Sequence, residues 1–441
     1  MFISRNIMVA LGVFAIFVVF VSVLLSGTAQ GVPEVPAIRA EFYLFTITLL
    51  GVALFHEFTM YVALTGLASV LAMKLMFVED FSVVHHFEQE WPILVNLLGL
   101  LLGFAILAKH FEESKVPDIL PRFLPDDWLG GFVLLALIFA ISAFLDNIAA
   151  AMIGGTIALR VFKGRVDIGY LAAIVAASNA GGAGTVVGDT TTTMMWIAGV
   201  PPTEVFRAFA AGVPALLVFG VICSIKQHKY QPIQKEEIGH HKVDWVKLGI
   251  VALILAGAIG ANFWIGFPAA GVWVAIIAGA LVSKTPWGEV PNAIKGTIFL
   301  LALVACASLM PVEELPEASW MTAFALGCIS AVFDNIPLTK LALEQDGYDW
   351  GMLAYTVGFG GSMIWFGSSA GVALTNMFPH AKSVGAWIKH GWSIALAYVV
   401  GFAVLMLTLG WNPDRIHELP VETNATGAAQ AQDEAPRAEI E

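Results

Sequence analysis

Continuous apolar runs of about twenty residues recur along this chain of 441 residues, and a helix of that length spans a hydrocarbon core of about 30 Å. The composition agrees, since 58% of the residues are hydrophobic and only 13% are charged. So much apolar surface cannot be buried in a single water-soluble core. Barrel strands would instead alternate apolar and polar residues. The runs therefore exclude a soluble enzyme, a disordered protein and a nucleic-acid-binding protein, and they predict an all-α polytopic membrane protein.

Two kinds of apolar segment can be distinguished. Ordinary spans are predicted at 7–26, 41–55, 60–78, 93–109, 205–225, 248–263, 268–283, 297–311 and 391–410. Four further segments are interrupted by polar or glycine-rich stretches, at 128–162, 168–200, 319–343 and 350–378. We expect about 11 transmembrane helices, two broken helices among the interrupted segments, and two re-entrant hairpins at 128–162 and 319–343. The run at 7–26 could be a signal peptide ending near Ala29, but its length favours a retained span.

These segments group into five parts along the chain. The predicted parts are N-terminal scaffold helices at 1–122, a first transport repeat at 123–226, scaffold helices at 227–311, a second transport repeat at 312–410 and a disordered acidic tail at 411–441. Each repeat contains one hairpin followed by one broken helix. The two transport repeats thus alternate with two sets of scaffold helices.

The distribution of Lys and Arg predicts the orientation in the membrane. If the N-terminus is cytoplasmic and both hairpins leave on the side where they entered, most of the 22 basic residues fall in cytoplasmic loops. If segment 128–162 crossed fully, the basic loops at 160–167 and 226–247 would change sides and this bias would collapse. We therefore expect a multi-pass protein of the bacterial cytoplasmic (inner) membrane, with a cytoplasmic N-terminus and an external C-terminus. The acidic loops at 79–90 and 313–317 would then lie outside.

The interrupted segments are two copies of one pattern. SAFLDNI at 142–148 matches SAVFDNI at 330–336, and GGAGTVVGDT at 181–190 matches GGSMIWFGSS at 360–369. Both matches occur in the same order, which chance seldom produces. In the predicted topology the first hairpin enters from inside and the second from outside, so the repeats are inverted. Inverted repeats with broken helices are typical of secondary transporters, whose binding site lies at the repeat interface.

The interruptions carry the residue types that a buried binding site needs. Irregular backbone is tolerated in a membrane only where it lines a protein-enclosed cavity. Glycine permits a broken helix and the close approach of a ligand to the backbone. The glycines expected to do so are Gly181, Gly182, Gly188, Gly360, Gly361 and Gly367. Asp146, Asp189 and Asp334 lie inside apolar segments, where a charge is costly and functional by default, so they are the candidate Na⁺ ligands.

At these residues the chain resembles the ion transporter superfamily, and within it the NhaD-type sodium/proton antiporters. The resemblance rests on ASNAGGAGTVVGDTTTTMMWIAG at 177–199, on the tips DNI at 146–148 and DNIP at 334–337, and on GFGGSMIWFGSSAGVALTN at 358–376. It implies a homodimer with a rigid scaffold and a mobile transport domain, in which the hairpin tips meet the unwound helices around bound cations. It implies no cofactor other than the transported Na⁺ and H⁺.

The leading hypothesis is a secondary active transporter that exchanges Na⁺ or Li⁺ for H⁺ by an elevator-type mechanism. Three carboxylates lie at the breaks, and no Lys or Arg lies at the hairpin tips or in the unwound stretches. The alternative is a Na⁺-coupled anion or carboxylate transporter of the same superfamily, because helix N-termini and bound Na⁺ could supply positive charge. An enzyme is not expected, since no nucleophile–base pair or metal motif is recognisable. The expected partners are inorganic cations, protons, the lipid bilayer and a second copy of the chain, but no nucleic acid.

Asp146 and Asp334 are expected to bind cation and proton in competition, which is the basis of antiport. The polar neighbours expected to complete the site are Asn147, Asn335, Ser178, Asn179, Thr190, Ser368 and Ser369. Asp189 ends the first glycine motif at the position where the second copy has Ser368. It is either a third charge on the cation pathway, beside hydroxyl ligands Thr190 and Thr191, or only the N-cap of the resumed helix.

Overall fold

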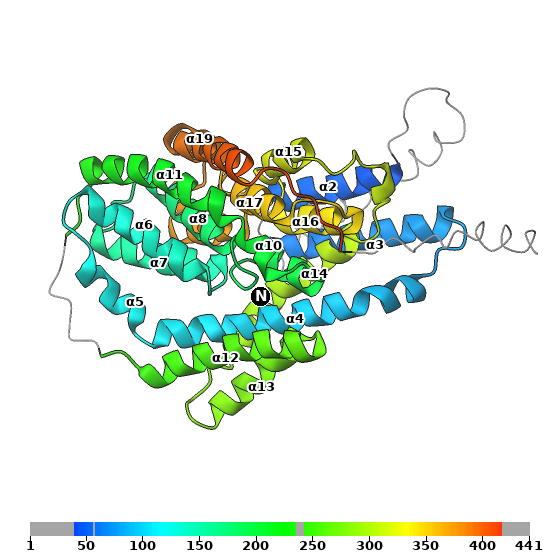
Figure 1. Cartoon of the computed structure of the whole chain (residues 1–441), viewed down its shortest axis with the longest axis horizontal. Coiled ribbons are helices and arrows are strands. Elements are labelled where there is room, and N and C mark those ends of the chain that lie inside the picture. The colour runs from blue at the N-terminus through cyan, green and yellow to red at the C-terminus, as the bar shows by residue number, and fades with distance from the viewer. Residues whose placement is uncertain (1–38, 56–57, 235–241, 417–441) are drawn as a thin grey trace, which may run out of the picture.

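The computed structural model describes residues 39–55, 58–234 and 242–416, and all regular structure within these ranges is helical (Figure 1). Among the described residues, six helices are long and apolar enough to cross a membrane. These helices support the predicted class, an all-α polytopic membrane protein. The predicted span at 7–26, with its signal-peptide alternative, and most of the predicted acidic tail lie outside the described residues.

One set of helices packs around the long helix α4 and is called the α4 group here. Its members are α2 (Ala40–Leu54), α3 (Thr59–Phe77), α4 (Val83–Glu113), α12 (Trp245–Ile265), α13 (Pro268–Ala280) and α14 (Glu289–Ala307). Helix α4 contacts α12, α13 and α14, while α3 contacts α2 and α14. In Figure 1, α4 runs along the lower part of the molecule, with α12 and α13 below it.

The remaining long helices form the hairpin group. They are α6 (Trp128–Ser142), α7 (Asn147–Val161), α8 (Ile168–Gly182), α9 (Thr190–Ile197), α11 (Phe209–Tyr230), α15 (Trp320–Ser330), α16 (Asn335–Gln345), α17 (Trp350–Gly360), α18 (Ser369–Met377) and α19 (Val384–Thr408). Short helical turns connect them: α5 (Val116–Ile119), η1 (Leu120–Phe123), α10 (Pro202–Phe206), η2 (Val312–Glu314) and η3 (Pro379–Ala381). The two groups meet where α14 contacts α16 and where α4 contacts α9.

Two helices of the α4 group begin earlier than the sequence analysis predicts. Helix α4 begins at Val83 instead of residue 93, and α14 begins at Glu289 instead of residue 297. The predicted acidic loop at 79–90 is therefore wrong, because most of it is the first part of α4. Its charged residues break the apolar run, but Ser82 caps the helix by accepting a hydrogen bond from the main-chain N–H of His85 (3.3 Å).

The predicted interruptions are confirmed as breaks between helices. Helix α6 ends at Ser142 and α7 begins after Asp146, and in the same way α15 ends at Ser330 and α16 begins after Asp334. Helices α6 and α7 pack against each other in antiparallel fashion, with Gly154 directly against the side chain of Ile138. The glycine-rich segments at 183–189 and 361–368 separate α8 from α9 and α17 from α18.

Equivalent glycines hold each broken helix against its hairpin. Gly181 of α8 lies against the main-chain carbonyl of Phe139 in α6, and Gly360 of α17 lies against that of Gly327 in α15. A β-carbon at either glycine would collide with the neighbouring backbone. The equivalent serines of the two hairpins make equivalent hydrogen bonds: Ser142 donates to the Ser178 carbonyl (2.6 Å), and Ser330 donates to the Val357 carbonyl (2.8 Å). The repeated sequences therefore have the same local structure.

The two repeats also pack on each other, the hairpin of each against the broken helix of the other. Helix α7 of the first repeat packs on α18 of the second, while α16 of the second packs on α9 of the first. Helices α11 and α19, the last helices of the two repeats, pack along each other. This crossed arrangement brings both hairpin tips and both broken helices into one region of the molecule.

Loops of both helix groups lie at two ends of the molecule. At one end, called the α5 end, Asp244 N–H donates to the Ser114 carbonyl and Gln234 N–H to the Val161 carbonyl (2.8 Å each). At the opposite end, Arg39 pairs with Glu314 (3.5 Å), and Gln345 donates to the Pro316 carbonyl (2.7 Å). The α5 end lies at the left in Figure 1.

Candidate functional site

Four helices of the hairpin group begin in the region where the repeats meet, and a predicted site residue caps each of them. The helices and their caps are α7 (Asp146), α9 (Asp189), α16 (Asp334) and α18 (Ser368). Each cap accepts a hydrogen bond from a first-turn N–H, at 2.9–3.3 Å. Free N–H groups and the helix dipole make a helix N-terminus positive. At three of these four ends a carboxylate balances that positive charge.

The first repeat forms a closed hydrogen-bond network. The Asn147 amide donates to Asp189 Oδ2 (2.8 Å) and to Asn179 Oδ1 (3.0 Å). The other carboxylate oxygen of Asp189 accepts hydrogen bonds from the Thr191 N–H (2.9 Å) and hydroxyl (3.0 Å). Asp189 is only 2% exposed, and Asn179 is fully buried. Asp189 therefore caps α9 and at the same time binds the first hairpin.

Asn179 also joins the two repeats. Its amide nitrogen donates to Ser362 Oγ (3.0 Å) and to Ser368 Oγ (3.2 Å), both in the unwound segment of the second repeat. All three side chains are buried. A single asparagine thus connects the first hairpin, through Asn147, with the cap of α18.

The second repeat is less completely bonded. Asp334 accepts a hydrogen bond from the Ser369 hydroxyl (3.3 Å) in addition to its cap. Asn335, the counterpart of Asn147, is 3% exposed, and its amide nitrogen has no hydrogen-bond partner among the described residues. The reason lies in the sequence, because the positions equivalent to Asn179 and Asp189 are Gly358 and Ser368. The second half of the site therefore has an unused amide beside a carboxylate.

The three aspartates differ in exposure and do not form one compact cluster. Asp146 and Asp334 are half-buried, whereas Asp189 is buried. Within the part of the chain that the structure describes, no three His, Cys, Asp or Glu residues converge as a metal-binding group. The arrangement is a pair of half-sites, one in each repeat, linked through Asn179.

The hydroxyl groups around the site fall into two classes. Thr191 bonds to the Asp189 carboxylate. Thr192 and Thr193 instead face main-chain carbonyls, those of Asp189 (2.9 Å each) and those of Thr185 (2.6 Å) and Val186 (2.9 Å) in the unwound segment. Ser178 donates to the Val175 carbonyl (2.9 Å) within α8. Thr190 is buried at the first position of α9.

Several residues at the site were not predicted. Ser142 and Ser330 bond the helices α8 and α17, and the matched heptapeptides that begin with these serines already contained that signal. Ser362 of the second unwound segment accepts from Asn179. Away from the site, Lys340 was also missed, since no basic residue lies at the hairpin tips themselves. It lies on α16, only 2% exposed, and pairs with Glu90 of α4.

The family of the chain follows from comparison with known proteins. The family described as "Citrate transporter" matches residues 5–360, which include both hairpins, the first broken helix and the start of the second. The chain belongs to the citrate transporter (CitMHS) family. This membership confirms the predicted resemblance to the ion transporter superfamily. Together with the apolar helices it identifies an integral membrane protein of a transporter family.

Relatives from a plant and from two bacteria resemble this chain over most of its length. "Sodium/proton antiporter 1" of Arabidopsis thaliana is 25% identical over 363 residues, covering 71% of this chain and 62% of the relative. "Na(+)/H(+) antiporter NhaD" of Vibrio cholerae is 27% identical over 374 residues (70% and 77%), and that of Vibrio parahaemolyticus is 28% identical over 371 residues (69% and 87%). The chain therefore spans less than two thirds of the Arabidopsis relative.

Proposed function

We propose that this protein is a secondary active transporter that exchanges Na⁺ or Li⁺ for H⁺. The observation that carries the proposal is the capping of three helix N-termini, in the region where the repeats meet, by Asp146, Asp189 and Asp334. An anion would have to compete with these carboxylates for the same N–H groups. A cation, in contrast, finds carboxylate oxygens already oriented by the helices. The names of the antiporter relatives support the same proposal.

Competition for a carboxylate gives the exchange. A buried carboxylate loses its unfavourable charge either by binding a proton or by binding a cation. Asp146 and Asp334 each keep part of their surface accessible, so either ligand can reach them. The neutral oxygens next to them, from residues such as Asn335 and Ser369, would complete the coordination of a hard cation. A site that holds only one of the two at a time couples their movements in opposite directions.

The second candidate is a Na⁺-coupled carboxylate transporter. Two observations favour it: the family is described as citrate transporters, and the N-terminus of α18 is capped by the uncharged Ser368. A substrate carboxylate could bind at that one end without displacing an aspartate. This candidate requires an anion to be held next to Asp334, because the Asp334 carboxylate accepts a hydrogen bond from Ser369, the first residue of α18.

The larger organisation belongs to the same proposal. The hairpin group, 123–226 and 312–410, would be the transport domain, and the α4 group would be a scaffold in a homodimer. An elevator-type movement would carry the hairpin tips from one side of the membrane to the other. The α5 end would face the cytoplasm of a bacterial cell, because loops such as 160–167 and 226–247 are rich in Lys and Arg.

Transport by purified protein in proteoliposomes tests the proposal. A Na⁺ gradient should drive proton movement, read by a pH-sensitive dye inside the vesicles, and labelled citrate or succinate should not accumulate. Asp146→Asn and Asp334→Asn should each abolish this proton movement, because the amide cannot exchange a proton for Na⁺. Asp127→Asn is the matched control, since Asp127 also caps a hairpin helix, through Leu129 N–H (3.0 Å), but far from the site. Na⁺-dependent citrate uptake would favour the second candidate, and full exchange in both site variants would contradict the proposal.

A further inference from the structure

A buried ion pair connects the second hairpin to the α4 group. Lys340 of α16 is 2% exposed, and its ammonium nitrogen lies 2.9 Å from a carboxylate oxygen of Glu90 on α4. Glu90 is 9% exposed, and Lys340 also pairs with Glu344 one turn along α16. Neither Glu90 nor Lys340 touches the predicted site. Their pairing joins the two helix groups directly, 250 residues apart in sequence.

The first hairpin has no equivalent of this pair. Met152 and Lys340 each lie six residues after the aspartate at their hairpin tip, so they occupy the same position of the two repeats. In the same way Thr156 is the counterpart of Glu344. One hairpin therefore presents a thioether and a hydroxyl where the other presents two charges.

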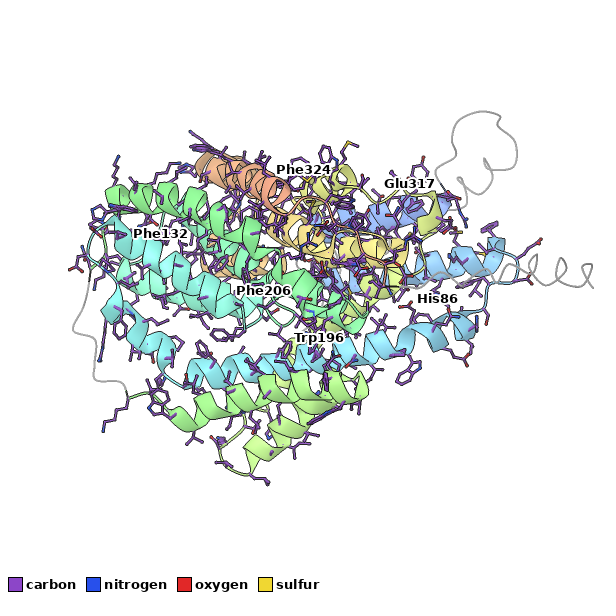
Figure 2. All side chains as sticks on the ribbon, viewed as in Figure 1. His86, Phe132, Trp196, Phe206, Glu317 and Phe324 are labelled. Carbon is purple, nitrogen blue, oxygen red and sulfur yellow. The ribbon has the colours of Figure 1, made fainter. Side chains whose placement is uncertain are left out.

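The space beside the two hairpins differs as well. A cavity of about 500 Å³ separates α7 from α4, and Met152, Thr156 and Arg160 lie along its wall. Beside α16 the cavity is smaller, about 360 Å³, and Glu90, Lys340 and Glu344 line it. Helix α16 also packs on α14, and Trp196 of α9 lies where α9 contacts α4 (Figure 2). The first hairpin does pair Arg160 with Asp118 (3.7 Å), but Asp118 belongs to the short α5 turn and not to the α4 group. The second hairpin is thus attached to the α4 group by an ion pair at the face where the first has none.

We propose that the Lys340–Glu90 pair is a latch that holds the second hairpin on α4 and biases the protein toward this conformation. The proposal rests on the proposed transport function. Inverted repeats alternate between two states by exchanging the surroundings of their halves, so in the other state α7 would be attached and α16 separated. That separation must break the pair. Because Met152 replaces Lys340 in the first repeat, the other state would lack an ion pair at this position, which would make the two states unequal in free energy.

Cysteine accessibility tests the latch without measuring transport. The reporters are Thr156→Cys, in the larger cavity, and Leu343→Cys, which is 4% exposed and lines the smaller one. Each is introduced into a chain whose native Cys223, Cys306 and Cys328 are replaced by serine. The latch is removed by Glu90→Gln together with Lys340→Met, which leaves neither member of the pair as an unpaired buried charge and copies the first repeat at position 340. A water-soluble maleimide then reports the labelling rate of each cysteine in membranes.

Removal of the latch should slow labelling of Thr156→Cys and speed labelling of Leu343→Cys, changing the ratio of the two rates by about tenfold. The exchanged pair Glu90→Lys with Lys340→Glu should return the ratio toward that of the unmodified latch. Lys389→Met, at an exposed lysine of α19, is the control and should leave the ratio unchanged. An unchanged ratio in the double variant, or the same ratio in both double variants, would overturn the proposal.

A second pair of substitutions and a readout independent of transport complete the test. If the Met variant does not accumulate in the membrane, Glu90→Gln with Lys340→Gln replaces it, because two amides can still bond to each other. Labelling requires no Na⁺ gradient, so a shifted ratio supports the latch even if the transport assay rejects Na⁺/H⁺ exchange. An unshifted labelling ratio together with normal Na⁺/H⁺ exchange would overturn the latch proposal and leave the proposed transport function in place.

Discussion

Asp189 serves the site through both of its carboxylate oxygens. One oxygen caps α9 by accepting a hydrogen bond from the Thr191 N–H, and the other accepts a hydrogen bond from the Asn147 amide of the first hairpin. In the second repeat Ser368 caps α18 without a charge. The two interpretations of Asp189, a helix cap and a charge on the cation pathway, are therefore compatible. The geometry establishes the cap, and a change that removes only the charge tests the second role.

Asp189→Ser separates the two roles, because serine caps a helix nearly as well as aspartate. The helix should remain, so the protein should accumulate in the membrane and keep its thermal unfolding temperature. If the charge belongs to the ion pathway, half-maximal exchange should require about tenfold more Na⁺, corresponding to ~1.4 kcal/mol of binding. Exchange rates measured across a Na⁺ series and at two pH values give the answer. An unchanged Na⁺ requirement would make Asp189 a cap only.

The residues of the candidate site and its surroundings differed in how readily the sequence indicated them. Asp146 and Asp334 were evident because a carboxylate inside an apolar run is costly, and both stand at confirmed helix breaks. Lys340 was missed because its partner Glu90 lies in a segment that was predicted to be a loop. The link from Asn179 to Ser362 and Ser368 was also beyond reach, since it depends on how two distant segments face each other.

At the scale of helices, Gly181 and Gly360 show that the repeat is a packing motif as well as a sequence motif. Each lets a broken helix touch the backbone of its hairpin, against the carbonyl groups of Phe139 and Gly327. Helix breaks such as these were easier to predict from the sequence than helix starts. A break requires glycine and a polar residue, which are visible in the sequence. The start of α4 instead includes residues such as Glu90, which a neighbouring helix neutralises.

Gly181→Ala should therefore destabilise the protein, because its methyl group would collide with the Phe139 carbonyl and displace α8 from α6. Overpacking of this kind costs about 1–3 kcal/mol. Gly249→Ala is the control, since the space around Gly249 in α12 is open and alanine favours helix. Thermal unfolding in detergent, followed by size-exclusion chromatography, should show a lower transition temperature for Gly181→Ala alone. Equal temperatures for both variants would show that the contact can relax.

On the scale of the whole molecule, the distribution of charge predicts which end faces the cytoplasm. Lys242 belongs to the loop at the α5 end, and Glu317 lies in the loop that follows η2 at the opposite end (Figure 2). In cells with an intact cytoplasmic membrane, Glu317→Cys should react with an impermeant maleimide, and Lys242→Cys should react only after permeabilisation. The cysteine-free chain serves as the background. The reverse pattern would invert the proposed orientation while leaving the fold unchanged.

The crossed contacts between the repeats also have a consequence for biosynthesis. Helix α7 packs on α18 and α9 packs on α16, so neither repeat can complete its packing alone. The ribosome releases the first hairpin and broken helix well before the second, and in that interval Asn179 has neither Ser362 nor Ser368 to bond. Until then the bonds from Asn147 to Asp189 and Asn179 can form within the first half, but the Asn179 amide nitrogen lacks its partners from the second. Assembly of the site is a late event, reached only when the second broken helix has entered the membrane.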